Sequence, residues 1–98
     1  MKIPDKVKVG GKDYKIVWND ELLTNEGFNG LACHRELIIY LCKIYRGDKL
    51  AKSNIEEVFL HEIIHAVDTV YNNHSLDEDT VDRLSQGLYQ VLKDNFKL

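Results

Sequence analysis

The spacing of apolar residues changes halfway along this 98-residue chain, and that change restricts the fold more than any other feature. In the first half, polar and apolar residues alternate at 6–9 and at 14–18, which is typical of half-buried strands. From residue 53 onward, apolar residues recur every three or four positions, which indicates helices. Strands followed by two helices predict an α+β domain.

The first half is expected to form two hairpins. A Gly-Gly pair at 10–11 separates the first two strand-like segments, which favours a tight turn. Residues 20–30 predict a short helical turn followed by a glycine-rich loop. A second turn centred on 35–36 would place Cys33 opposite Ile38 on neighbouring strands.

The second half is expected to form two helices, at about 53–72 and about 77–94. Ser53 and Glu56 fit a capping box at the start of the first helix. The apolar stripe of that helix is expected to pack on the sheet and comprises Ile55, Phe59, Ile63, Ala66, Val67 and Val70. The apolar stripe of the second helix comprises Val81, Leu84, Leu88, Val91 and Leu92.

The composition of the chain argues against several functional classes of protein. The 13 basic and 16 acidic residues give a net charge of −3, which argues against a nucleic-acid module with a basic face. No apolar run approaches the roughly 18 residues that span a bilayer, and no apolar leader is visible. Cys33 and Cys42 are too few for a disulfide scaffold and suggest free thiols in a reducing compartment. We expect one cytoplasmic domain over residues 1–98, with neither nucleic acid nor membrane as a partner.

An H-E-x-x-H motif, formed by His61, Glu62 and His65, lies on the first predicted helix. A spacing of four residues puts the two imidazoles one turn apart on the same face, where both can reach one metal ion at about 2 Å. Glu62 lies about 100° further round the helix, beside the metal but not bound to it. Zinc lowers the pKa of bound water toward about 7, so Glu62 is expected to act as general base.

Catalytic zinc needs a third protein ligand and an open fourth position. The candidates are Asp77, Glu78 and Asp82 at the start of the last helix, and His74 in the turn before it. Acidic residues are also favoured at helix N-termini for capping, so spacing alone does not choose among them. Asp68, on the same face of the first helix as the histidines, is expected to orient a zinc-bound imidazole.

Residues 61–68, 76–78 and 81–95 together resemble the small phage-type metallopeptidases, which are zincin-like proteins distantly similar to the ImmA/IrrE-type peptidases. The close likeness covers the C-terminal half of the chain, and the N-terminal half agrees only in its strand-rich order. The resemblance implies a minimal zincin fold with a short antiparallel or mixed sheet, an active-site helix and a second helix that supplies an acidic ligand.

The same resemblance assigns roles to individual residues. It implies that His61 and His65 bind zinc and that Glu62 is the catalytic base. It favours Glu78 as the third metal ligand. A stricter match to the ImmA/IrrE-type helix would place that ligand near Thr80, whose side chain is unsuited to the role.

We therefore expect a zinc metallopeptidase that hydrolyses peptide bonds in a peptide or protein substrate by means of metal-activated water. If phage-encoded, it would act in the host cytoplasm. The alternative is a non-catalytic, metal-stabilised protein-binding module, which a closed four-ligand site including His74 would favour. A nucleic-acid-binding role is the weakest hypothesis. The sequence patterns specify neither the substrate nor the oligomeric state.

Overall fold

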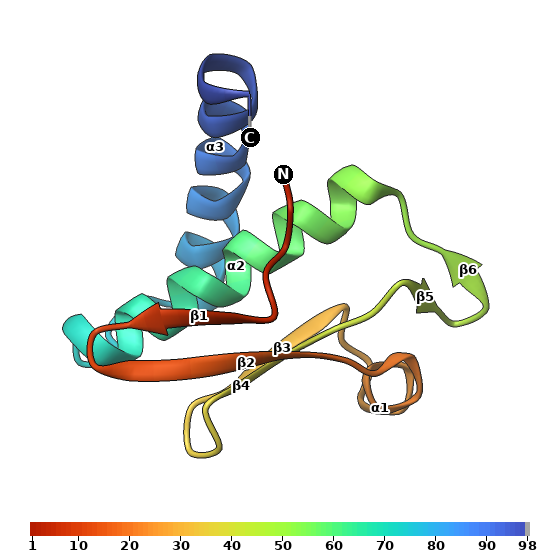
Figure 1. Ribbon diagram of the computed structural model, residues 1–98, viewed down its shortest axis with the longest axis horizontal. Coiled ribbons are helices and arrows are strands. Elements are labelled where there is room, and N and C mark those ends of the chain that lie inside the picture. Colours follow the sequence, from red (N-terminus) through yellow and green to blue (C-terminus); the bar gives the residue numbers. More distant parts are fainter. Residues whose placement is uncertain (98) are drawn as a thin grey trace.

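A four-stranded sheet carries the long helix α2 (Lys52–Tyr71) on one face, and helix α3 (Glu78–Phe96) crosses α2 and rises away from the sheet (Figure 1). A short helix, α1 (Asp20–Glu26), follows the second strand and lies at one end of the sheet. The computed structural model describes residues 1–97. The predicted α+β class is confirmed, as are the two helices in the second half.

The sheet is mixed and has the order β1-β2-β4-β3. Its strands are β1 (Lys6–Val9), β2 (Lys12–Trp18), β3 (Gly30–Cys33) and β4 (Ile38–Leu41). β1 and β2 pair antiparallel, as do β3 and β4, whereas β2 and β4 run parallel in the middle of the sheet. This order makes β3 an edge strand.

Both predicted hairpins are present. Gly10 adopts a φ of 62° in the turn between β1 and β2, a conformation that glycine tolerates without steric cost. Cys33 pairs with Ile38 between β3 and β4, which confirms the predicted register. The small hairpin of β5 (Ile44–Tyr45) and β6 (Asp48–Lys49) was not predicted, because two-residue strands are too short to show alternation.

The core lies between the sheet and α2. The buried residues that form it are Val9, Tyr14, Ile16, Ile39, Leu41, Phe59 and Ala66. The predicted α2 stripe therefore packs on the sheet in part. Val67 departs from it, because its side chain is 42% exposed.

The predicted capping box at the start of α2 is wrong. The N-cap is Ala51, which makes no side-chain capping bond. Glu56 is instead buried, and its Oε1 accepts a hydrogen bond of 2.6 Å from the hydroxyl of Tyr89 on α3. Its Oε2 lies 3.3 Å from the amino group of Met1. Because Tyr89 donates to Oε1, Glu56 joins α2 to α3 instead of capping its own helix, while Oε2 makes an ion pair with the amino group and no hydrogen bond among residues 1–97.

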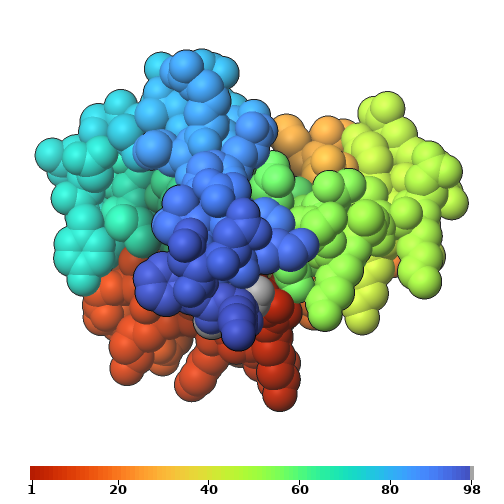
Figure 2. Space-filling model, turned by 90° about the horizontal axis from the view of Figure 1, so that it is seen from above, coloured from red at the N-terminus to blue at the C-terminus, as the bar shows by residue number. Residues whose placement is uncertain are grey.

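The predicted apolar stripe of α3 is also largely wrong. Val81 is buried as expected, but the other buried residues of α3 are Ser85 and Tyr89. Leu84, Leu88 and Val91 are 50%, 41% and 43% exposed. The reason is that α3 packs on α2 along one narrow row of residues four apart, while the rest of its surface faces outward (Figures 1 and 2).

Two sequence expectations concern the environment of the protein. Among residues 1–97, none of the helices combines the length and apolar character that crossing a bilayer requires. Cys33 and Cys42 are both free thiols. Cys42 is buried, and its Sγ lies 3.4 Å from the carbonyl oxygen of Asn29, to which it donates.

Candidate metal centre

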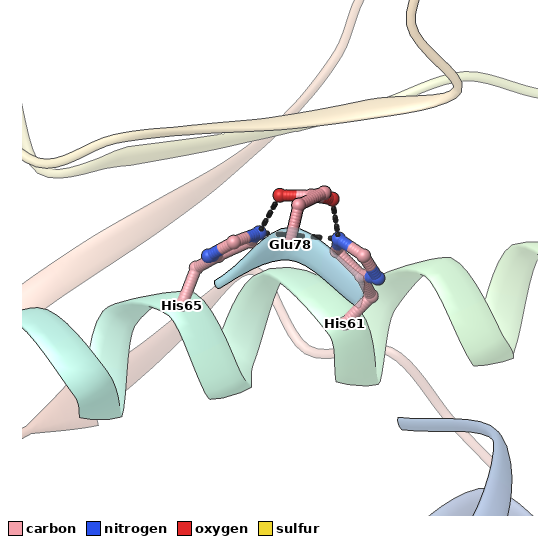
Figure 3. A group of neighbouring side chains, drawn as sticks. All are labelled: His61, His65 and Glu78. Carbon is pink, nitrogen blue, oxygen red and sulfur yellow. Dashed lines mark hydrogen bonds and ion pairs between the residues drawn. The ribbon is translucent and has the colours of Figure 1, made fainter. Parts of the chain in front are cut away.

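Three side chains converge at the junction of α2 and α3 (Figure 3). His61 and His65 project from successive turns of α2, and Glu78 reaches them from the first residue of α3. The two imidazole Nε2 atoms lie 3.1 Å apart. Glu78 Oε1 lies 2.7 Å from Nε2 of His61, and Oε2 lies 2.9 Å from Nε2 of His65. The structure thus brings together the two histidines of the motif and one of the four candidate third ligands.

This donor set matches the requirements of a zinc ion. All three ligand atoms lie within 4.8 Å of one another. Atoms bound to tetrahedral zinc at about 2.0–2.1 Å are about 3.3 Å apart, so small movements of these side chains would place an ion among them. Two imidazole nitrogens and one carboxylate oxygen would hold the ion through three protein ligands, the number found in catalytic zinc sites. Burial also lowers the pKa of His65, which favours the neutral imidazole that a metal ion needs.

Glu62 lies beside this group in a dry environment. Its side chain is buried, with only 5% of the residue exposed, and it lines the same cavity as the histidines. Burial and, to a lesser extent, the charge of Glu78 raise the pKa of Glu62, a hydrogen bond with the backbone of Ala32 opposes the rise, and the net result is a pKa of about 8. A carboxyl group in such a site can take up and release a proton near neutral pH.

The other candidate third ligands have different partners. Asp77 caps α3, because its Oδ1 accepts a hydrogen bond of 2.7 Å from the amide of Thr80. Asp82 Oδ1 lies 3.6 Å from Nδ1 of His61, on the opposite side of the ring from Glu78. His74 lies in the turn between the helices, with Nδ1 at 3.2 Å from Oγ1 of Thr69.

Asp68 does not orient a histidine of the motif, contrary to the sequence-based expectation. Its buried carboxylate accepts hydrogen bonds from the Asn72 side chain and from the amides of Ser75 and Leu76, at 3.0–3.3 Å. These bonds fold the turn between α2 and α3, so Asp68 acts on the position of Glu78 through the backbone. Asp68 Oδ2 instead lies 3.9 Å from Nδ1 of His74. Asp82 is the carboxylate near Nδ1 of the motif residue His61.

The three converging side chains open into a cavity of about 590 Å³. Edge strand β3 forms one wall through Gly30, Leu31 and Ala32. The remaining lining residues are Phe28, Asn29, His34, Val58, His61, Glu62, His65, His74, Glu78 and Asp82. The site is therefore accessible from outside, next to a strand edge.

Gly30 is a site residue that the sequence analysis missed. A Cβ at this position would lie 2.5 Å from Cγ1 of Val58 and 3.0 Å from Oε2 of Glu62. Only glycine allows β3 to approach α2 so closely. No local pattern marks this glycine, because the requirement comes from a helix that follows it by more than twenty residues.

Comparisons with protein-family models, curated proteins and solved structures found no match to this chain. Three features of the chain itself indicate a metal centre. They are the H-E-x-x-H spacing, the convergence of three suitable donor atoms and the buried carboxyl group of Glu62 on the same cavity.

Proposed function

We propose that this protein is a zinc-dependent metallopeptidase of minimal zincin type, with His61, His65 and Glu78 as ligands and Glu62 as general base. The observation that carries the proposal is the position of Glu62. Its buried carboxyl group lies next to three converging metal-ligand atoms and faces an open cavity. A purely structural zinc site has four protein ligands and no need of such a group.

Zinc bound to these residues supplies two effects, the acidification of water and the polarisation of a carbonyl group. Glu62 Oε atoms accept the proton of the attacking water and return it to the leaving amine. The dry surroundings of Glu62 suit this transfer, because burial limits proton exchange between its carboxyl group and bulk water. Asp82 lies 3.6 Å from Nδ1 of His61, where its charge favours the tautomer that leaves Nε2 available to a metal ion.

A peptide substrate can bind in the cavity by lying along the outer edge of β3. An edge strand offers unpaired backbone N–H and C=O groups, to which an extended peptide can add as a further strand. Gly30 presents no side chain there, while Phe28 and Leu31 supply apolar contacts for substrate side chains. Because few residues line the cavity, it suits broad specificity for the sequence of the peptide substrate. Free Cys33 and Cys42 suit a reducing cytoplasm, which is the host cytoplasm if the protein comes from a phage.

The proposal is tested by comparing wild type with Glu62→Gln after reconstitution with zinc. We expect one zinc ion per chain in both proteins, and cleavage of an unstructured peptide library by wild type only, with a loss of at least about 100-fold in the variant. Glu26→Gln, the same change on an exposed residue of α1, serves as the matched control and should retain activity. Absence of stoichiometric zinc would refute the site. Equal cleavage by both proteins would refute the role of Glu62. Zinc binding without cleavage by either would favour the protein-binding module.

A further inference from the structure

Helix α3 carries an apolar face that nothing in the described chain covers. Leu84, Leu88 and Val91 lie on this face with 50%, 41% and 43% of their surfaces exposed. Gly87 lies among them, and a Cβ added there would meet no atom within 4 Å. At 100° per residue, these four positions fall within about 100° of one another around the helix. We call them the outer stripe of α3.

We propose that the outer stripe is a self-association surface, on which α3 packs antiparallel against α3 of a second copy of this chain. The four residues of the outer stripe are spaced symmetrically along the helix, so their spacing is the same when counted from either end. A two-fold axis between positions 87 and 88 therefore sets Leu84 against Val91 of the second copy. The same axis sets Leu88 against Gly87 of the second copy.

Gly87 supports this arrangement. Glycine inside a helix costs about 1 kcal/mol relative to alanine, and no contact within residues 1–97 accounts for it here. In the antiparallel pair, the missing side chain leaves space for Leu88 of the other copy. Small residues allow two helix backbones to approach closely, with a larger side chain filling the space between them.

The charges along one flank of the stripe favour a second copy over an unrelated partner. Asp79 and Arg83 lie on this flank near the start of α3, and Asp94 lies on it near the end. Antiparallel pairing about the same axis brings Arg83 close to Asp94 of the second copy. This contact joins opposite charges and is repeated by the two-fold axis, since antiparallel pairing brings the same flank of both helices together.

The shape of the molecule leaves room for such a pair. The C-terminal part of α3 rises beyond the body of the protein in Figure 1, and in Figure 2, seen from above, it lies in the foreground near the centre of the view. Arg83 and Asp79 are 72% and 76% exposed in their side chains and pair only with each other across one turn, at 3.1 Å, among the contacts of residues 1–97. Arg83 can exchange this weak pair for a contact with Asp94 of a second copy.

The test is the mass of the full chain in solution, measured by light scattering and sedimentation between about 1 and 100 µM. We expect the mass to rise from 11.4 kDa toward twice that value. Arg83→Glu should weaken association at least about 10-fold, and the double variant Arg83→Glu/Asp94→Arg should restore it. Lys12→Glu, which makes the same change in net charge on an exposed strand residue, should associate as wild type does.

Gly87→Gln provides a second, steric test. Its side chain points into open space in the single chain, so circular dichroism should show an unchanged fold while association is lost. A chain that stays at 11.4 kDa throughout the concentration range would overturn the proposal. So would a double charge variant that associates no better than Arg83→Glu, or a Gly87→Gln chain that associates as tightly as wild type.

Discussion

Glu62 and Gly30 lie so close together that a methyl group on the glycine would come within 3.0 Å of the glutamate Oε2. Helix α2, which bears the H-E-x-x-H motif, and edge strand β3, which forms a wall of the cavity, therefore have complementary shapes at this point. The glycine allows the strand to lie against Glu62, and the strand in turn excludes water from the carboxyl group. The chemistry proposed for Glu62 depends on this contact.

Gly30→Ala is expected to displace Glu62 and reduce peptide cleavage by about 10–100-fold. The added Cβ would also lie 2.5 Å from Cγ1 of Val58, and overpacking of this kind costs about 1–3 kcal/mol. Gly11→Ala is the matched control, because a Cβ there meets nothing within 4 Å. Cleavage rates and urea denaturation of both variants measure the effects. Equal rates for the two variants would show that the contact with Gly30 does not position Glu62.

Glu78→Gln is expected to weaken zinc binding at least about 100-fold, because it removes a charged ligand atom that lies near both imidazoles. Asp77→Asn should leave zinc affinity within a few-fold of wild type, since Asp77 contacts the amide of Thr80 instead. Titration with a competing zinc indicator gives both affinities. The shift of the melting temperature on adding zinc gives an independent measure. A larger loss of zinc affinity in Asp77→Asn than in Glu78→Gln would instead identify Asp77 as the third ligand.

Tyr89→Phe is expected to destabilise the fold by about 2 kcal/mol, because the buried carboxylate of Glu56 loses a hydrogen bond of 2.6 Å. Burial by itself would raise the pKa of Glu56, and the bond from Tyr89, with the nearby amino group, lowers it below its usual value. Tyr71→Phe is the matched control. It removes a hydroxyl from a residue that is 70% exposed and should leave the free energy of unfolding unchanged. Urea denaturation distinguishes the two.

Asp68→Asn is expected to destabilise the protein at neutral pH and to do so less as the pH falls. Burial opposes ionisation of Asp68, but hydrogen bonds from Asn72, Leu76 and Ser75 outweigh it and lower the pKa of this carboxyl group. A lowered pKa means that ionised Asp68 stabilises the fold above its unfolded pKa of about 4. That contribution is lost as the pH falls toward the folded pKa.

The measurement for Asp68 is the difference in urea midpoint between wild type and Asp68→Asn, taken at pH 7 and pH 3. The difference should shrink at pH 3, whereas Asp48→Asn, on an exposed strand residue, should differ little from wild type at either pH. A difference that grows at low pH would show that the hydrogen bonds do not favour the ionised form.

Local patterns predicted the elements of this fold well. Alternation located β1 and β2, the position of the second turn set Cys33 opposite Ile38, and helical spacing located α2 and α3. These features depend on residues within one or two turns of each other, and so they are visible in a short window of sequence.

The capping box and the outer part of the α3 stripe were mispredicted because their outcome depends on distant partners. Glu56 has the right spacing to cap α2, but Tyr89 lies 33 positions away and takes its Oε1. Leu84 and Leu88 have the right spacing for a core, but α3 packs on α2 through Ser85 and Tyr89 instead.

The α+β order of elements follows from local sequence patterns, as does the placing of His61 and His65 on one helical face with Glu62 beside them, because a helix repeats every 3.6 residues. Which acidic residue joins the two histidines depends on the packing of the folded chain. The turn folded around Asp68 directs Glu78, and neither Asp77 nor Asp82, toward both imidazoles. That outcome depends on how two helices cross, and no spacing along the chain encodes a crossing angle.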